Sequence, residues 1–436
     1  MVKKKVEGLT IEEKLNNALI PVDKQPYEIP KNWCWVKTES IFSIVYGKGL
    51  SSKDLIEEGF PVFGANGQIG YYNEYMFEQP KALMSCRGAY SGVMNFSFPK
   101  SFITSNSLII EGKNISIPAK FIYYLYSTLN VKRIVTGSAQ PQITINKLKV
   151  FPVPLPPLAE QERIVNKLDN YISKLDEAKE KLEKVVDTYN YRKNLILYRA
   201  FTGQLTKNWR KENNISFDNW VNTNIGNVCK DVKVGIVIKP SQYYTDEKNG
   251  TPAFRSANVR EFHVDNFDWV YLNPIGMKLN KRTIVHTGDI LIVRSGNPGT
   301  ACMITEEFDG FNAIDVLIAI PNKDKILSEF LCAYTNSPII RDEIFANKRG
   351  SVIEHFNVRS YSKLPINLPP LEEQKEIIKI LDSVLSKEKQ VKEIAEKEIE
   401  RVEDLKKNLL TRAFGGVLGT NDPNEENSIE LLKSVL

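Results

Sequence analysis

Short polar runs flanked by glycine carry the side chains that could do chemistry in this sequence. Arg87 and Tyr90 lie in SCRGAYSG, and Arg255 lies in RSANVR. Arginine, asparagine and glutamine can form paired hydrogen bonds with guanine and adenine edges, so base recognition is one candidate chemistry. Ser, Asn and Gly also build ordinary turns, and His355 fits a structural role better than base contact. The candidate contact residues are Lys48, Ser51, Ser52, Lys53, Arg87, Tyr90, Asn106, Ser138, Gln140, Gln142, Arg255, Ser256, Asn258, Arg260, Arg294, Ser295, Asn297, Lys348, Arg349 and Ser351.

Motifs for catalysis are absent from the sequence. The glycine-rich run 64–70 lacks the lysine and hydroxyl of a phosphate loop and predicts a turn. No H-E-x-x-H, G-x-S-x-G, EF-hand or N-P-P-Y/F motif occurs. The three histidines, His263, His286 and His355, lie too far apart for metal-ligand spacing. We therefore expect no catalytic residue, no cofactor and no metal.

Length and composition indicate a cytoplasmic protein of several domains. The chain has 436 residues, 42% of them apolar, 25% charged, and a net charge of +5, which permits a nucleic-acid partner without proving one. The five cysteines form no C-x-x-C pair, so a disulfide framework is not expected. The N-terminus lacks the apolar run of a signal peptide, and no stretch of 18 apolar residues occurs, so we expect no membrane segment.

An internal repeat organises the chain. LPPLAEQERIVNKLD starts at Leu155, and LPPLEEQKEIIKILD starts at Leu368, an offset of 213 residues. The same offset aligns the R-A-F runs at 199–201 and 412–414 and the Gly-Ser pairs at 137–138 and 350–351. Because flanking landmarks repeat together with the helical segments, the pattern indicates a duplication.

Each repeat predicts a long helix with one apolar stripe. Proline can open such a helix, and Gly203 and Gly415–Gly416 can end it, so the first would run from Leu158 to Ala200, about 60–65 Å. A soluble chain cannot leave a long apolar stripe exposed, so we expect the two helices to pair within the chain, with homodimeric pairing as the alternative. The stripe follows a 3.5-residue period through Ile164, Leu168, Tyr171, Leu175, Ala178, Leu182, Val185, Tyr189 and Ile196, with one polar step at Arg192. In the second helix it passes through Ile377, Leu381, Val384, Glu388, Val391, Ala395, Glu398, Val402, Leu405 and Leu409.

Two globular segments precede the helices. Apolar runs such as 107–110, 289–295 and 315–320 predict strands, and 121–129 and 328–336 predict short helices. The first segment carries a net charge of +6 and the second +2. The expected divisions are an arm at 1–30, a mixed α/β domain at 31–157, a helix at 158–206, a mixed α/β domain at 207–370, a helix at 371–419 and an acidic tail at 420–436.

The two chain ends give smaller signals. Thr10 and Glu13 form a capping-box pattern that predicts a short helix. The acidic tail could be disordered or could form a helix that docks a partner.

The order domain–helix–domain–helix, with LPPLAEQ and LPPLEEQ opening the helices and R-A-F-x-G ending them, resembles the specificity subunit of Type I restriction-modification enzymes. The resemblance covers nearly the whole chain. It implies an α+β fold in which two target recognition domains are separated by two helices that pair as an antiparallel coiled coil with a pseudo-twofold axis. It also implies that the N-terminal arm packs near the distal end of the other domain's helix.

The resemblance further implies a function and partners. Each domain would read one half of a bipartite sequence in double-stranded DNA, and the helices would set the spacing and dock methyltransferase subunits, with restriction and translocase subunits joining the complex. The subunit itself would have no catalytic residue. Two alternatives remain open: a coiled-coil scaffold with two protein-binding domains, and an enzyme whose site leaves no sequence motif.

Overall fold

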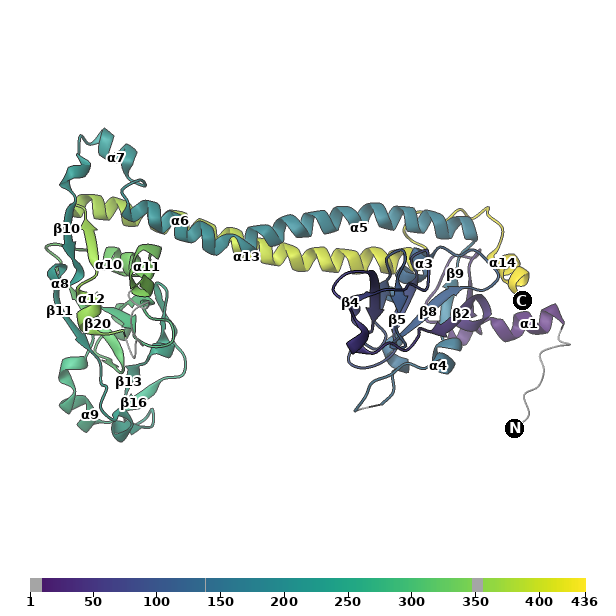
Figure 1. Cartoon of the computed structure of the whole chain (residues 1–436), viewed down its shortest axis with the longest axis horizontal. Coiled ribbons are helices and arrows are strands. Elements are labelled where there is room, and N and C mark those ends of the chain that lie inside the picture. Colours follow the sequence, from purple (N-terminus) through teal and green to yellow (C-terminus); the bar gives the residue numbers. More distant parts are fainter. Residues whose placement is uncertain (1–9, 138, 347–355) are drawn as a thin grey trace. The chain divides into compact units, whose positions relative to one another are not determined.

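Each half of the chain contains one domain and segments of two long helices (Figure 1). The computed structural model describes residues 10–137, 139–346 and 356–436. The first unit comprises Met1–Leu182 and Lys397–Leu436, and the second comprises Glu183–Glu396. The first domain extends from β1 (Cys34–Lys37) to β9 (Pro152–Leu155), and the second extends from β10 (Val221–Asn224) to β21 (Pro365–Leu368).

The first domain has two sheets and a closing strand pair. Its main sheet has the order β2-β8-β5-β6, and its smaller sheet has the order β4-β3-β7, with β3 and β7 parallel. The run Leu108–Ile110 predicted as a strand lies in β8, where its side chains are buried. The elements are β1 (Cys34–Lys37), α2 (Thr38–Ile41), β2 (Phe42–Tyr46), β3 (Phe60–Gly64), β4 (Gly67–Tyr72), β5 (Ala82–Ser85), β6 (Met94–Phe96), β7 (Phe102–Ile103), β8 (Ser107–Gly112), α3 (Ala119–Thr128), α4 (Ile145–Lys149) and β9 (Pro152–Leu155).

The second domain repeats this topology, although its interior sequence differs. Its main sheet has the order β11-β20-β17-β18, its smaller sheet the order β12-β16-β13-β19, and β13 and β19 are parallel. The expected strands and short helices of both domains are confirmed. The elements are β10 (Val221–Asn224), α8 (Ile225–Val228), β11 (Cys229–Val234), β12 (Tyr244–Thr245), β13 (Thr251–Phe254), β14 (Val259–Arg260), β15 (His263–Val264), β16 (Val270–Leu272), α9 (Pro274–Leu279), β17 (Ile290–Val293), β18 (Ala301–Met303), β19 (Asn312–Ala313), β20 (Val316–Pro321), α10 (Ser328–Thr335), α11 (Pro338–Ala346), α12 (Val358–Ser362) and β21 (Pro365–Leu368).

The long helices are α5 (Leu158–Asp187), α6 (Tyr189–Phe201) and α13 (Leu371–Phe414). The helix expected to be continuous over 158–200 is interrupted at Thr188, whose hydroxyl donates to the Lys184 carbonyl at 2.6 Å. A side chain that bonds to the backbone of the preceding turn competes with helical hydrogen bonding and bends helices.

The x-E-Q part of the repeated motif forms a buried joint in each unit. In the second unit, Glu373 is fully buried and accepts hydrogen bonds from Thr206 at 2.6 Å and from the Trp220 indole at 2.8 Å, and it forms an ion pair with Arg210. In the first unit, the equivalent Glu160 accepts from Thr420 at 2.6 Å. Each joint therefore ties the start of one long helix to the segment that follows the end of another.

The neighbouring glutamines hold the helix starts. Gln161 donates to the Pro156 carbonyl at 3.0 Å, and Gln374 donates to the Pro369 carbonyl at 2.9 Å. Both glutamines are fully buried. Because a buried amide needs a partner, these bonds fix how each helix leaves its domain.

The long helices pair antiparallel within each unit. In the first unit, α5 lies beside α13 (Figure 1). Lys179 there pairs with Glu403 at 2.7 Å, and Asp176 pairs with Lys406. In the second unit, Arg192 of α6 pairs with Glu388 of α13 at 2.8 Å. In these pairs the residue number rises along one helix while it falls along the other, so the two helices run in opposite directions.

The predicted apolar stripe is wrong at several positions. Tyr171 is 39% exposed and Val391 is 47% exposed, and Ala178 and Leu405 are also exposed. Ile172, rather than Tyr171, packs against the core of the first unit. The first turns of α5 lie against a domain as well as against α13, so a period taken from paired helices alone shifts the buried face.

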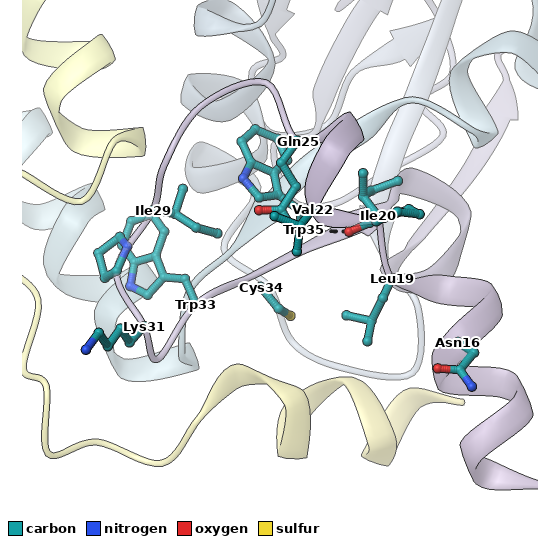
Figure 2. A pocket seen from close by; sticks show the side chains of 12 residues that line it. Asn16, Leu19, Ile20, Val22, Gln25, Ile29, Lys31, Trp33, Cys34 and Trp35 are labelled. Atoms are coloured by element: carbon teal, nitrogen blue, oxygen red, sulfur yellow. Dashed lines mark hydrogen bonds between the residues drawn. The ribbon is translucent and has the colours of Figure 1, made fainter.

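Both chain ends pack onto the first domain. Helix α1 (Ile11–Ala18) begins at the expected Thr10–Glu13 capping box. Tyr27 donates to the carbonyl of Phe414 at 3.3 Å, so the arm contacts the end of α13, as the resemblance implied. Figure 2 shows the arm around Trp33 and Trp35, where it lines an open pocket of about 470 Å³.

The acidic tail is not disordered. It forms α14 (Ser428–Val435), whose Leu432 is fully buried in the core of the first unit. Ser428 N donates to the Asn32 carbonyl at 3.0 Å, and Arg163 pairs with Glu425 at 2.7 Å. The tail therefore completes the first unit.

Candidate nucleic-acid interface

Loops of the first domain meet at one end of its main sheet. Lys48 N donates to the Ile103 carbonyl at 2.9 Å, and Ser105 N donates to the Lys48 carbonyl at 2.9 Å. Cys86 N donates to the Asn106 carbonyl at 2.9 Å. The ends of β2 and β5 and the turn between β7 and β8 are thus joined through the backbone, which leaves their side chains available.

Glycine permits the close approach that this joining needs. A Cβ atom on Gly47 would lie 2.3 Å from the Ile103 carbonyl oxygen, and one on Gly235 would lie 2.4 Å from the Ala313 carbonyl oxygen. Neither space can hold a side chain, so both domains need glycine where the first strand of the main sheet meets the smaller sheet.

A fourth segment joins the same end of the sheet. Gly88 N donates to the Pro141 carbonyl at 2.8 Å, and the Ser91 hydroxyl donates to the same carbonyl at 2.8 Å. An isolated antiparallel bridge pairs Arg87 with Gln142. Sequence positions from 48 to 142 therefore converge.

We call Lys48, Arg87, Asn106 and Gln142 the polar edge of the first domain. All four are exposed, and within the described part of the chain their side chains form no hydrogen bond or ion pair. The Arg87 charge still acts locally, because it opposes the rise that burial causes in the pKa of the Cys86 thiol. Unpaired polar side chains on a backbone-fixed surface can meet an external ligand without first breaking internal bonds.

The other first-domain candidates differ in support. Tyr90, which is 46% exposed, and the exposed Gln140 flank the polar edge in the 86–93 and 136–143 loops. Ser51, Ser52 and Lys53 belong to an exposed turn, which Ser51 caps by accepting from Lys53 N at 3.3 Å. Among the described residues, no hydrogen bond joins this turn to the polar edge. Ser138, Lys348, Arg349, Ser351 and His355 lie outside the described residues.

The second domain repeats the backbone joining. Ile236 N donates to the Ala313 carbonyl at 2.8 Å, and Asp315 N donates to the Ile236 carbonyl at 3.1 Å. Phe356 N donates to the Arg294 carbonyl at 3.4 Å, as Ile143 N does to the Cys86 carbonyl at 3.0 Å. The Arg294–Asn297 run therefore takes the place in the second domain that the Arg87 loop takes in the first.

The side chains on this framework differ between the domains. Lys48 is replaced by Ile236 at the equivalent position. Arg294 forms an ion pair with Asp315 and donates to the Phe356 carbonyl at 3.2 Å, and its side chain is only 14% exposed. Ser295 is half-buried and Asn297 is exposed beside it. The same framework thus presents different chemistry.

Asn258 is a correction to the candidate set. Its side chain is fully buried, accepts from Arg255 N at 2.9 Å and donates to the Phe267 carbonyl at 2.7 Å. These bonds hold a loop, so the amide is unavailable to an external base. The sequence pattern alone does not distinguish such an asparagine from an exposed one.

The neighbouring candidates keep partial exposure. Arg255 pairs with Asp268 at 2.8 Å, and Arg260 pairs with Asp265 at 3.0 Å. Their side chains remain 33% and 45% exposed, and Ser256 is half-buried.

The largest difference between the two sets of loops is an insertion in the second domain. Two residues, Ala65 and Asn66, connect β3 to β4, whereas residues 255–269 connect β13 to β16. The insertion contains the β14–β15 hairpin, which contacts β17 and β18. His263 lies in this hairpin, although the sequence analysis considered this residue only as a metal ligand and rejected that role. The only sign of this insertion in the sequence was that the second domain is longer than the first.

Other site types find no support within the described ranges. No group of three or more His, Cys, Asp or Glu side chains there could hold a metal ion. No described helix combines the length and the apolar character needed to cross a lipid bilayer.

Comparison with known proteins gives a consistent result. The family model of the Type I restriction modification DNA specificity domain matches residues 30–187 and again 218–401. The EcoDI specificity subunit of Escherichia coli, from a Type I restriction enzyme, is 23% identical over 434 residues, which cover 90% of each chain. The EcoKI specificity subunit of the K12 strain is 25% identical over 339 residues, 76% of this chain and 68% of that protein.

Solved structures share the fold. A chain from a structure on complex assembly and conformational transition of the type I R-M system aligns with a TM-score of 0.66 at 18% identity, covering 90% of this chain and 100% of that chain. The HsdS subunit from Thermoanaerobacter tengcongensis aligns with a TM-score of 0.57 at 18% identity, covering 91% of this chain and 100% of that chain.

Proposed function

Because this chain belongs to the Type I restriction modification DNA specificity family, we propose that it is the DNA-recognition subunit of a Type I restriction-modification complex. In this proposal each domain reads one half of a bipartite target in double-stranded DNA. The observation that carries it is the repeated backbone framework, on which Lys48 and Arg87 in one domain are replaced by Ile236 and Ser295 in the other. Lys48 and Arg87 are exposed, whereas Ile236 is buried and Ser295 is half-buried, so the two similar frameworks present different surfaces, which suits two different half-sequences.

The long helices are proposed to form an antiparallel coiled coil, with a pseudo-twofold axis, that sets the gap between the half-sequences. Support comes from the antiparallel ion pairs within each unit and from the buried Glu160 and Glu373 joints. Two domains that read separate half-sequences need both a fixed distance and a fixed helical phase on DNA, which has about 10–10.5 base pairs per turn. Stiff helices supply both.

Chemistry and partners are assigned to the rest of the complex. We propose that the chain is non-catalytic, docks methyltransferase subunits, associates with restriction and translocase subunits, and works in the cytoplasm. The contact residues proposed for the first domain are the polar edge together with Tyr90 and Gln140, and for the second domain Arg255, Ser256, Arg260, Ser295 and Asn297. Arg294 holds its own loop in place through the ion pair with Asp315, and only the exposed part of its side chain is available to contact DNA.

Mapping of methylated adenine in cells tests the proposal. The chain is co-expressed with a Type I methyltransferase subunit, and genomic methylation is sequenced. The expected result is one two-part motif with an unread spacer, which disappears when this chain is omitted. A motif that persists without the chain would refute the assignment.

A further inference from the structure

The β14–β15 hairpin of the second domain presents two side chains on its outer face. Arg260 and His263 are directly opposite each other in the antiparallel register, and both are exposed. The adjacent pair, Val259 and Val264, faces inward and packs in the domain core. Because side chains alternate along a strand, this register separates a buried face from a solvent face.

Each of the outer residues is held from one side. The Arg260 guanidinium pairs with Asp265 at 3.0 Å and donates to the Val259 carbonyl at 3.2 Å. His263 Nδ1 lies 3.0 Å from the Glu261 carbonyl oxygen, which can only accept, so Nδ1 donates and Nε2 is left for other contacts. These contacts use one N–H on each terminal nitrogen of Arg260, and each of these nitrogens keeps a second N–H for an external acceptor.

The turn of the hairpin is anchored to two helices. Glu261 forms ion pairs with Lys193 of α6 and with Arg341 of α11. Phe262 follows with φ 68°, a left-handed conformation that a bulky residue adopts only where its surroundings hold it, and its N–H donates to the Ala301 carbonyl at 3.0 Å. The outer face therefore has a defined position relative to the second domain and α6.

The local charges favour a neutral target group over a phosphate. The Asp265 carboxylate is paired with Arg260 and would repel a phosphate there, whereas base edges carry no net charge. The Glu261 carboxylate is instead balanced by Lys193 and Arg341. Arginine binds the O6 and N7 acceptors of guanine through two parallel hydrogen bonds.

We propose that Arg260 reads a guanine in the second half of the target, that His263 contacts the neighbouring base edge, and that Glu261 is the positioning residue that fixes both. This inference rests on the proposed DNA-recognition function. It names an element that the first domain lacks, because Ala65 and Asn66 close the corresponding turn there.

The test uses the full complex with its methyltransferase subunits and a duplex carrying the mapped motif. Arg260→Ala is expected to weaken binding roughly 10- to 100-fold and to remove discrimination at one position of the second half only. His263→Ala should relax the adjacent position. Arg282→Ala and His286→Ala are matched controls, because both residues are exposed in the same domain but outside the hairpin, and they should leave the motif unchanged.

Glu261→Gln separates positioning from folding. If Glu261 acts through the outer face, this variant should relax the same base position as Arg260→Ala, and the double variant should be little worse than Arg260→Ala alone. A uniform loss of affinity with a reduced salt slope and an intact motif would instead indicate a phosphate contact and overturn the proposal. A wild-type complex without sequence preference would refute the proposed function, whereas a preserved motif in Arg260→Ala refutes only this inference.

Discussion

Glu373 and Trp220 share a buried hydrogen bond of 2.8 Å that links the start of α13 to the first strand of the second domain. The same carboxylate binds Arg210, whose side chain is 9% exposed. A charged group so completely enclosed is stable only while its partners remain.

Glu373→Ala is therefore expected to destabilise the second unit by about 3–5 kcal/mol, because it leaves the Arg210 charge buried without its partner. Urea unfolding followed by circular dichroism measures the change. Glu372→Ala is the matched control, since the Glu372 side chain is 75% exposed one residue earlier, and it should shift stability by less than about 0.5 kcal/mol. Equal effects of the two substitutions would contradict the buried joint.

Exchange of the first domain should change one half of the recognised sequence. Replacing 31–157 with the corresponding segment of a relative is expected to alter one half-sequence and leave the other intact, since the polar edge lies entirely within this segment. Methylation mapping gives the result. Alteration of both halves would show that the domains do not read independently.

Lengthening the helix pair should lengthen the unread spacer. Inserting four residues beside Lys179 in α5 and four beside Glu403 in α13 keeps the paired faces nearly in phase and adds about 6 Å. That is just under two base-pair steps of about 3.4 Å, so both half-sequences should persist with a spacer one or two base pairs longer. Two-residue insertions rotate the apolar face by roughly 200° and should damage folding. If the variant with four-residue insertions is active and its spacer is unchanged, the helices do not set the length of the spacer.

The isolated chain is expected neither to methylate nor to cleave DNA. The sequence lacks the motifs for binding a methyl donor and for catalysis, and the proposed chemistry belongs to partner subunits. The measurement is methyl transfer from labelled S-adenosylmethionine to duplex DNA by the purified chain. Activity that co-purifies with the chain through denaturation and refolding would overturn the prediction.

The thiols should be unreactive in the folded chain below strongly alkaline pH. Burial raises the pKa of Cys34 to about 11 and that of Cys229 to about 12. Because the thiolate is the nucleophile, only about 0.1% of Cys34 would be in the reactive form at pH 8, against roughly 10% for an exposed thiol with the ordinary pKa of 9.0. Alkylation of Cys34 by iodoacetamide should accelerate as the pH rises toward 11. At pH 8, alkylation should be rapid only after the chain has been unfolded. Rapid labelling of native Cys34 at pH 8 would contradict its burial.

Sequence periodicity and landmarks predicted the repeat frame well, because those features are local. Proline-rich openings and R-A-F endings place the helices within a few residues of α5, α6 and α13. The buried face of α5 was harder to predict than its bounds. Ile172, rather than Tyr171, faces the core because the first domain packs against this helix. The hydrophobic pattern of the helix alone carries no information about the domain that packs against it.

The interface was only partly predictable for the same reason. Arg87 and Gln142 are separated by 55 positions, and their bridge depends on strands that the sequence does not register against each other. Asn258 resembles a surface residue in its RSANVR run, yet long-range packing buries it. The apolar residues of α14 could have indicated a packed tail, because Leu432 and Val435 lie one helical turn apart.

The first unit takes its core from both ends of the chain, since Phe414 and Leu432 pack with Trp33 and Phe121. During synthesis, the ribosome makes these last contributors hundreds of residues after the first domain has emerged. The second unit, by contrast, draws on one uninterrupted stretch, Glu183–Glu396. The domain that is translated first is consequently completed last, and a nascent chain must carry it with an uncovered apolar face until α13 and α14 have been made.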